Sequence, residues 1–153
     1  ETLEKLAETI AVRGNNRGDR TLFNPPLSEK VIIQAGRDYR LGLYHGLENF
    51  VQRITDTVIG RAGFESKCTV RLINRVKNHF HDVDAIVYGH GHWPIIYYDD
   101  PLLFINPGKA FGRKSSSYAL MEIRPSQIRI KIFPLGRFKK GKPIISEWKT
   151  FPF

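Results

Sequence analysis

The stretch Asp82-Val-Asp-Ala-Ile-Val-Tyr-Gly-His-Gly-His92 joins a short apolar run to two histidines separated by one glycine. Four consecutive apolar residues, from Ala85 to Tyr88, predict a buried strand, because a strand covered on both faces has no polar side to show. His90 and His92 follow the end of this strand within four positions. In sheets flanked by helices, strand ends on one edge converge at the ligand site. The stretch therefore predicts a binding site at the end of a central strand.

The segments before this strand predict a hairpin and a helical region. Residues 30–34 and 39–44 alternate around the turn sequence Ala35-Gly-Arg-Asp38, which predicts a β-hairpin. Residues 48–81 have mainly helical periodicity, broken near the glycines at 60 and 63. The apolar stripe expected on the second helix is Val70, Ile73, Val76, Lys77 and Phe80.

Most of the remaining chain has strand character. Turn residues separate apolar runs after the histidine stretch, and the chain before the hairpin has a short helical face at Leu3 and Leu6 followed by an apolar run. No internal repeat or compositional break divides the 153 residues. We expect an α/β fold with a β-rich C-terminal half, in one domain spanning residues 1–153. The further strands expected are residues 9–12, 95–98, 102–105, 118–123, 127–133 and 144–151.

Composition excludes several classes of protein. Apolar residues make up 41% of the chain and charged residues 25%, which is ordinary for a folded globular domain. The single cysteine, Cys68, excludes an internal disulfide and predicts a reducing, cytoplasmic setting. No apolar run approaches the length of about 20 residues that crosses a bilayer, so no membrane partner is expected. Cys68 itself is expected to be a small buried apolar residue.

The chain is basic, with a net charge of +9. Such a charge favours anionic partners, either a phosphate-bearing substrate or nucleic acid. The lysines and arginines are scattered, however, and cluster only at Lys139-Lys140-Gly-Lys142. A solvated basic surface is therefore the preferred interpretation, with nucleic acid as a partner that the charge permits but does not favour.

Four segments share one arrangement, in which a strand ends and a polar side chain able to bind a metal follows. These side chains are Asn15, His45, the pair His90 and His92, and Asn106. Three imidazoles with asparagine amide oxygens suit borderline divalent ions such as Mn²⁺, Fe²⁺, Ni²⁺ or Zn²⁺ better than Mg²⁺ or Ca²⁺ alone. Gly91 gives the backbone freedom to direct the two neighbouring imidazoles toward different ions.

Other polar and aromatic residues have simpler explanations. His79 and His81 end the expected helix, where a cationic side chain suits the negative end of the helix dipole. Trp93 is expected to pack at the rim of the site rather than to hold a substrate. These three residues are therefore not assigned to the site.

In combination, the motifs resemble those of the calcineurin-like metallophosphoesterases, in particular a small branch of bacterial and archaeal phosphodiesterases to which a retromer subunit is related. The residues that carry the resemblance, in order, are Val12-Arg-Gly-Asn-Asn16, Tyr44-His-Gly46, the stretch from Asp82 to His92, and Phe104-Ile-Asn-Pro-Gly108. The resemblance implies a two-sheet β-sandwich flanked by helices, here lacking the N-terminal strand and helix of the fold.

The resemblance also implies a metal site. Asn15, His45 and His90 match ligands of the second metal ion, and His92 matches a ligand of the first. Asn106-Pro-Gly108 matches a loop that closes the floor of the site and has a structural role. The implied activity is hydrolysis of a phosphoester, in particular a phosphodiester, by a hydroxide held between two divalent ions. Mn²⁺ is the expected cofactor, with Ni²⁺, Fe²⁺, Zn²⁺ or Mg²⁺ as alternatives, and no side chain is required as a nucleophile.

The sequence also departs from the family pattern. The first motifs of the family, Asp-x-His and Gly-Asp, are not among these residues and are expected upstream of Glu1. Arg17 stands in place of an aspartate, Asn16 where larger relatives have a catalytic histidine, and Leu47 in place of a second histidine. Gly91 stands where the small branch usually has threonine. These departures leave a second interpretation open, a catalytically inactive scaffold for protein–protein interaction. A homo-oligomer is also possible from the sequence.

Overall fold

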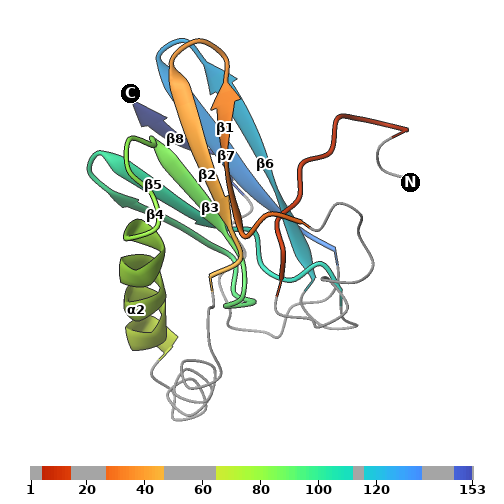
Figure 1. Ribbon diagram of the computed structural model, residues 1–153, viewed down its shortest axis with the longest axis vertical. Helices are drawn as coiled ribbons and strands as arrows, with labels where there is room; N and C mark the ends of the chain where they lie inside the picture. Colours follow the sequence, from red (N-terminus) through yellow and green to blue (C-terminus); the bar gives the residue numbers. More distant parts are fainter. Residues whose placement is uncertain (1–4, 15–26, 47–64, 112–115, 136–146, 153) are drawn as a thin grey trace.

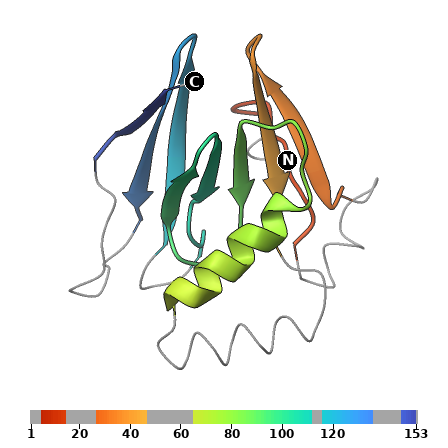
Figure 2. The ribbon, with the colours of Figure 1, turned by 90° about the vertical axis from the view of Figure 1, so that its left-hand side faces the viewer.

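A computed structural model describes residues 5–14, 27–46, 65–111, 116–135 and 147–152 of the chain. It contains one helix and eight strands in these ranges (Figure 1). Two sheets pack against each other, and the helix covers the opposite face of the larger sheet (Figure 2). The elements are β1 Lys30–Ala35, β2 Tyr39–Tyr44, α2 Glu65–Lys77, β3 Ala85–Tyr88, β4 Ile95–Asp99, β5 Leu102–Asn106, β6 Ser117–Arg124, β7 Gln127–Pro134 and β8 Lys149–Pro152.

The larger sheet has a parallel centre and antiparallel edges. Its strand order is β1-β2-β3-β5-β4. Strands β2, β3 and β5 run parallel, with Leu41 opposite Ala85 and Ala85 opposite Leu103. The hairpin partners β1 and β4 close the two edges in antiparallel pairing. The carboxyl ends of the three parallel strands therefore lie at one edge of the sheet.

The smaller sheet is an antiparallel meander of β6, β7 and β8. Isoleucines at 128, 130 and 132 face inward and are buried, because side chains alternate between the two faces of a strand. They pack against Ala85, Leu103 and Ile105 of the larger sheet. The two sheets thus share one core, as expected for the predicted sandwich.

A second core lies between the larger sheet and α2. Ile86 and Tyr88 of β3 and Phe104 of β5 point into it, while their neighbours in each strand serve the first core. Leu72, Ile73 and Val76 supply the helical side. Because β3 and β5 are covered on both faces, their continuous apolar sequences are explained.

The helix confirms only part of the predicted apolar stripe. Ile73 and Val76 are buried, but Val70 is 57% exposed, and Leu72 takes the place next to the sheet. Phe80 is also buried, although the helix ends at Lys77, because the turn that follows directs its ring against Gly42 of β2. The side chain of Cys68 and residues 48–64 lie outside the described residues.

Two further predictions need correction. Residues 9–12 do not form a strand, and Ile10 is 42% exposed, because no neighbouring described strand pairs with this segment. The strand expected over 144–151 is described only as β8, which begins at Lys149. The hairpin and the other predicted strands are confirmed, so the mixed α/β class and the two-sheet sandwich are as expected. Within the described residues, no helix is long and apolar enough to cross a membrane.

Candidate metal centre

The histidine stretch leaves β3 in a tight turn at the edge where the parallel strands end (Figure 1). The Gly89 amide donates to the Tyr44 carbonyl over 3.2 Å, and the Gly91 amide donates to the Gly89 carbonyl over 2.8 Å. His90 has φ = 65° and His92 has φ = 56°, both in the left-handed region that non-glycine residues rarely occupy. Strained backbone of this kind clusters at functional sites. Here it affects both histidines that were expected to bind metal.

His45 approaches this turn from the neighbouring strand β2. The rings of His45 and His90 have their centroids 5.7 Å apart, at an angle of 75°. A side chain at Gly89 would begin 3.1 Å from Nδ1 of His45, so glycine leaves the space that the imidazole occupies. Gly46 has φ = 103°, a left-handed conformation that favours glycine, and the nearest atom to a hypothetical Cβ there is Cδ1 of Leu72 at 3.2 Å. Of the two glycines, Gly89 therefore leaves the space beside the His45 imidazole, and Gly46 meets the backbone requirement of the chain after His45.

His92 lies on the outer side of this pair. Its ring centroid is 6.5 Å from that of His90, and the side chain is exposed. Trp93 follows it and is also exposed, so this aromatic residue lies at the rim, as expected from the sequence. The structure thus brings His45, His90 and His92 to one edge of the larger sheet.

Asn106, at the end of β5, holds the histidine turn through a side-chain hydrogen bond. Its side chain is 1% exposed, and its Nδ2 donates to the Gly89 carbonyl over 3.1 Å. Its Oδ1 accepts a hydrogen bond from the Gly108 amide, 2.9 Å away, and the Ser117 hydroxyl donates to the Pro107 carbonyl over 2.6 Å. Both polar ends of the buried amide are satisfied, which a buried polar group requires. Asn106 therefore ties the histidine turn to the end of β5, a structural role in agreement with the sequence-based interpretation.

Tyr88 is a residue that the sequence analysis did not assign. Its ring is buried in the core between the larger sheet and α2, and its hydroxyl has no hydrogen-bond partner among the described residues. Burial raises the pKa of this phenol above its usual range, so Tyr88 stays neutral. A tyrosine in place of an aliphatic residue at the end of an otherwise apolar strand is the signal that could have drawn attention to it.

The spacing of the imidazoles can be compared with that of metal ligands. Two imidazoles that share an ion, with metal–nitrogen distances of about 2.1 Å, have ring centroids about 5 Å apart. His45 and His90 are close to this arrangement, whereas His90 and His92 are farther apart. Among the residues that the structure describes, no three His, Cys, Asp or Glu side chains form a group able to hold an ion. An ion at His45 and His90 needs further donors, and Asn15 lies outside the described residues.

The chain belongs to the calcineurin-like phosphoesterase superfamily, whose domain model matches residues 1–126. Members of this family typically bind divalent metal ions, and the fold and the placement of the histidine turn agree with the membership. No curated protein matches the chain by sequence.

Solved structures with the same fold include two from protozoa and one from a bacterium. Vacuolar protein sorting 29 from Cryptosporidium parvum is 21% identical with a TM-score of 0.58, and the match covers 99% of this chain and 73% of that one. Vps29 from Entamoeba histolytica, complexed with Zn²⁺, is 21% identical with a TM-score of 0.55, covering 98% and 72%. An uncharacterized protein from Streptococcus pneumoniae, described as a predicted phosphoesterase, is 18% identical with a TM-score of 0.52, covering 88% and 67%.

Proposed function

We propose that the protein is a divalent-metal-dependent phosphoesterase that hydrolyses phosphodiesters. The observation that carries the proposal is the 5.7 Å separation of the His45 and His90 rings at the carboxyl ends of two parallel strands, in a chain of the calcineurin-like superfamily. In this proposal Asn15, His45 and His90 bind one ion and His92 binds a second. The domain extends over residues 1–153 and acts in the cytoplasm.

When bound, two divalent ions would orient the phosphate and stabilise the charge that develops on its oxygens. The chain would supply the positions of the ligands. His90 lies in the turn that is held by the hydrogen bond from Asn106 to the Gly89 carbonyl. His45 is positioned because it directly follows β2, which is paired with β3. Ligands that are fixed before the metal binds lose little conformational freedom on binding, which favours affinity and a defined geometry.

The donor set indicates which ions fit. Imidazole and amide donors favour borderline ions, so we propose Mn²⁺ as the cofactor, with Ni²⁺, Fe²⁺, Zn²⁺ or Mg²⁺ as alternatives. The Vps29 of E. histolytica, which shares the fold, was crystallised with Zn²⁺, and this supports binding of a borderline ion at such a site.

The decisive experiment measures hydrolysis of bis(p-nitrophenyl) phosphate by the complete gene product with and without Mn²⁺. Activity should require the ion, be removed by EDTA, and fall by about 100-fold or more in the His90→Ala variant, because a lost ligand weakens the site and its chemistry together. His81→Ala is the matched control, since His81 is exposed and lies away from the turn. Absence of metal-dependent hydrolysis in the complete protein would contradict the proposal.

A second candidate is a catalytically inactive scaffold that binds other proteins. It is favoured by the two Vps29 structures that share the fold and by the lack of a three-residue acidic or histidine group among the described residues. The two candidates differ in one respect that can be checked directly. An enzyme needs the Asp-x-His and Gly-Asp motifs upstream of Glu1, and a scaffold does not.

A further inference from the structure

The outward side of the smaller sheet has an unusual composition. We call it the outer aromatic face, and it consists of Tyr118, Arg124, Arg129, Lys131, Phe133 and Trp148. The inward residues of β7 are buried isoleucines, whereas this outward face carries aromatic rings and cations, with Leu120 and Glu122 between them on β6. No described helix or strand covers it (Figure 2). A purely solvated sheet face would need neither the rings nor the cations placed beside two of them.

The aromatic residues offer ring surface to the solvent. Tyr118 lies directly opposite Phe133 in the β6–β7 register, and the two rings are stacked with centroids 5.1 Å apart and an interplanar angle of 9°. Tyr118 is nevertheless 45% exposed. Phe133 thus fixes the orientation of a tyrosine ring that remains accessible, an arrangement suited to stacking with a planar group.

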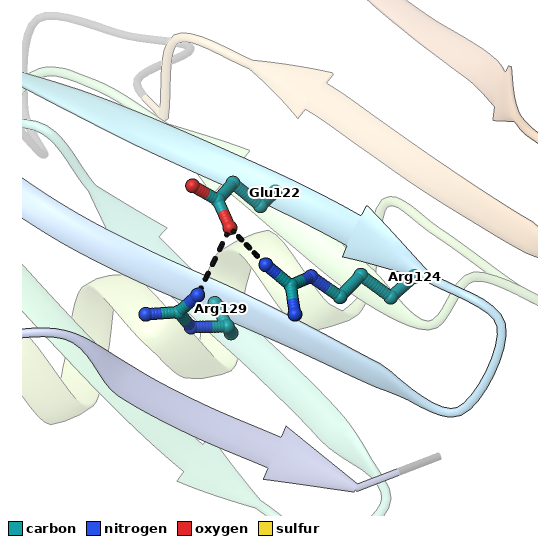
Figure 3. Close-up of polar contacts among 3 residues, drawn as sticks. All are labelled: Glu122, Arg124 and Arg129. Carbon is teal, nitrogen blue, oxygen red and sulfur yellow. Dashed lines mark hydrogen bonds and ion pairs between the residues drawn. The ribbon is translucent and has the colours of Figure 1, made fainter.

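The cations of this face lie beside the rings. The Lys131 ammonium is 4.9 Å from the centroid of Phe133, and the Arg129 guanidinium is 4.7 Å from the centroid of Trp148. Glu122 accepts from Arg124 over 3.1 Å and from Arg129 over 3.2 Å, which orients both guanidinium groups (Figure 3). Three cations against this one carboxylate leave an excess of two positive charges.

We propose that the outer aromatic face binds single-stranded nucleic acid. Unpaired bases would stack on Tyr118, and Lys131 and Arg124 would contact the phosphates. Flat rings beside cations match a strand that presents bases and phosphates alternately, and a sheet face is a common platform for such strands. The net charge of +9 adds a long-range attraction for a polyanion. A duplex hides its base faces and fits this surface poorly.

This binding is independent of the proposed metal centre. The histidine turn leaves the larger sheet at its strand ends, whereas the outer aromatic face belongs to the smaller sheet and faces away from that larger sheet. Nucleic-acid binding should therefore persist in EDTA and in a variant that carries both His90→Ala and His92→Ala. Loss of nucleic-acid binding in that variant would contradict the proposal that the outer aromatic face binds independently of the metal centre. It would not bear on the proposed hydrolysis.

The test is fluorescence anisotropy of a labelled oligothymidine of about 12 nucleotides, at about 50 mM salt. Tyr118→Ala and Lys131→Gln should each weaken binding about tenfold, and Lys131→Gln should also reduce the salt dependence. Tyr118→Trp should retain binding, which separates the loss of a stacking ring from damage to the fold.

Matched controls come from the rest of the molecule. Tyr97, on β4, is 46% exposed, and Arg71 is an exposed cation on α2, so Tyr97→Ala and Arg71→Gln should change affinity less than about twofold. The proposal is overturned if the oligonucleotide does not bind, if Tyr118→Ala and Lys131→Gln bind like the controls, or if a duplex of equal length binds as tightly.

Discussion

The larger and the smaller sheet differ in how many of their faces are covered. Strands β3 and β5 have one core on each side, so almost every side chain in them is buried. Strand β7 has a single core and alternates buried isoleucines with polar or charged residues. The sheet with two covered faces holds the histidine turn at its strand ends, and the sheet with one covered face presents a surface. The larger sheet thus supports the turn, and the smaller sheet offers an accessible surface.

The largest difference between the sheets is expected in stability. Phe104 is fully buried in β5, so Phe104→Ala should lower the free energy of unfolding by about 3–5 kcal/mol. Tyr118→Ala on the exposed face of β6 should cost far less, about 1 kcal/mol. Urea denaturation measures both values. Equal losses in the two variants would contradict the expectation that the strand covered on both faces depends more on packing than the exposed face of β6.

Asn106→Ala should have the next largest effect. The substitution removes one of two donors to the Gly89 carbonyl, which keeps the Gly91 amide, and leaves the part-buried Gly108 amide without its side-chain acceptor. The expected cost is about 1–3 kcal/mol in unfolding free energy. Because the side chain also fixes the histidine turn, Mn²⁺ affinity measured by titration calorimetry should fall about tenfold or more. Asn78→Ala, at an exposed position after α2, is the control and should change neither quantity. Unchanged metal affinity in Asn106→Ala would remove its positioning role.

Gly89→Ala should affect the metal site more than the fold. A Cβ at this position lies 3.1 Å from Nδ1 of His45, so the imidazole has to move, and we expect Mn²⁺ affinity to fall about tenfold. Gly36→Ala supplies the opposite case. Its φ of 70° makes alanine strained, but nothing lies within 4 Å, so it should lower stability by about 1 kcal/mol and leave metal affinity unchanged. Calorimetry and urea denaturation together distinguish the two patterns, and the same pattern in both variants would contradict the assignment of His45.

The smallest effect is expected on the smaller sheet. Glu122→Gln removes the charge that Arg124 and Arg129 share, but all three side chains are partly exposed and solvent screens their interaction. The free energy of unfolding should therefore change by less than about 0.5 kcal/mol in urea denaturation. A loss above 1 kcal/mol would show that this triad stabilises the sheet, in contrast to the purely surface role inferred from its exposure.

Strands with strong local patterns could be predicted from the sequence. Strand β7 has an isoleucine alternation that only a strand satisfies, and β3 and β5 are apolar runs too short for a helix and bounded by turn residues. All three are confirmed. Residues 9–12 have an apolar pattern as well, but a strand also needs a partner to accept its hydrogen bonds, and a pattern does not identify a partner. The stripe predicted for α2 was right for Ile73 and Val76, and Phe80 is buried as well, from the turn that follows the helix. It wrongly included the exposed Val70 and omitted the buried Leu72, because helical spacing alone does not say which apolar residue faces the sheet.

The sequence predicted which strand ends carry the histidines, but not the geometry of the turn that holds them. The motifs indicated that His45, His90 and His92 would meet at strand ends, and they do meet there. The motifs did not predict the hydrogen bond from Asn106 to the Gly89 carbonyl, because it joins residues that are 17 positions apart in the sequence. A tyrosine at the end of an apolar strand is visible in the sequence, but the lack of a hydrogen-bond partner for the Tyr88 hydroxyl among the described residues is not, because it depends on what surrounds the ring.

The division of β3 between two cores has a consequence for how this protein tolerates insertions and deletions. Ile86 faces the helix and Val87 faces the smaller sheet, so adding or removing one residue within β3 would exchange the faces of both. The same shift would move His90 relative to His45 by one position along the neighbouring strand. The two cores therefore fix the number of residues in β3 and, with it, the position of His90. A chain with one residue more or less in β3 would lose its packing, so it would not fold with the histidine displaced.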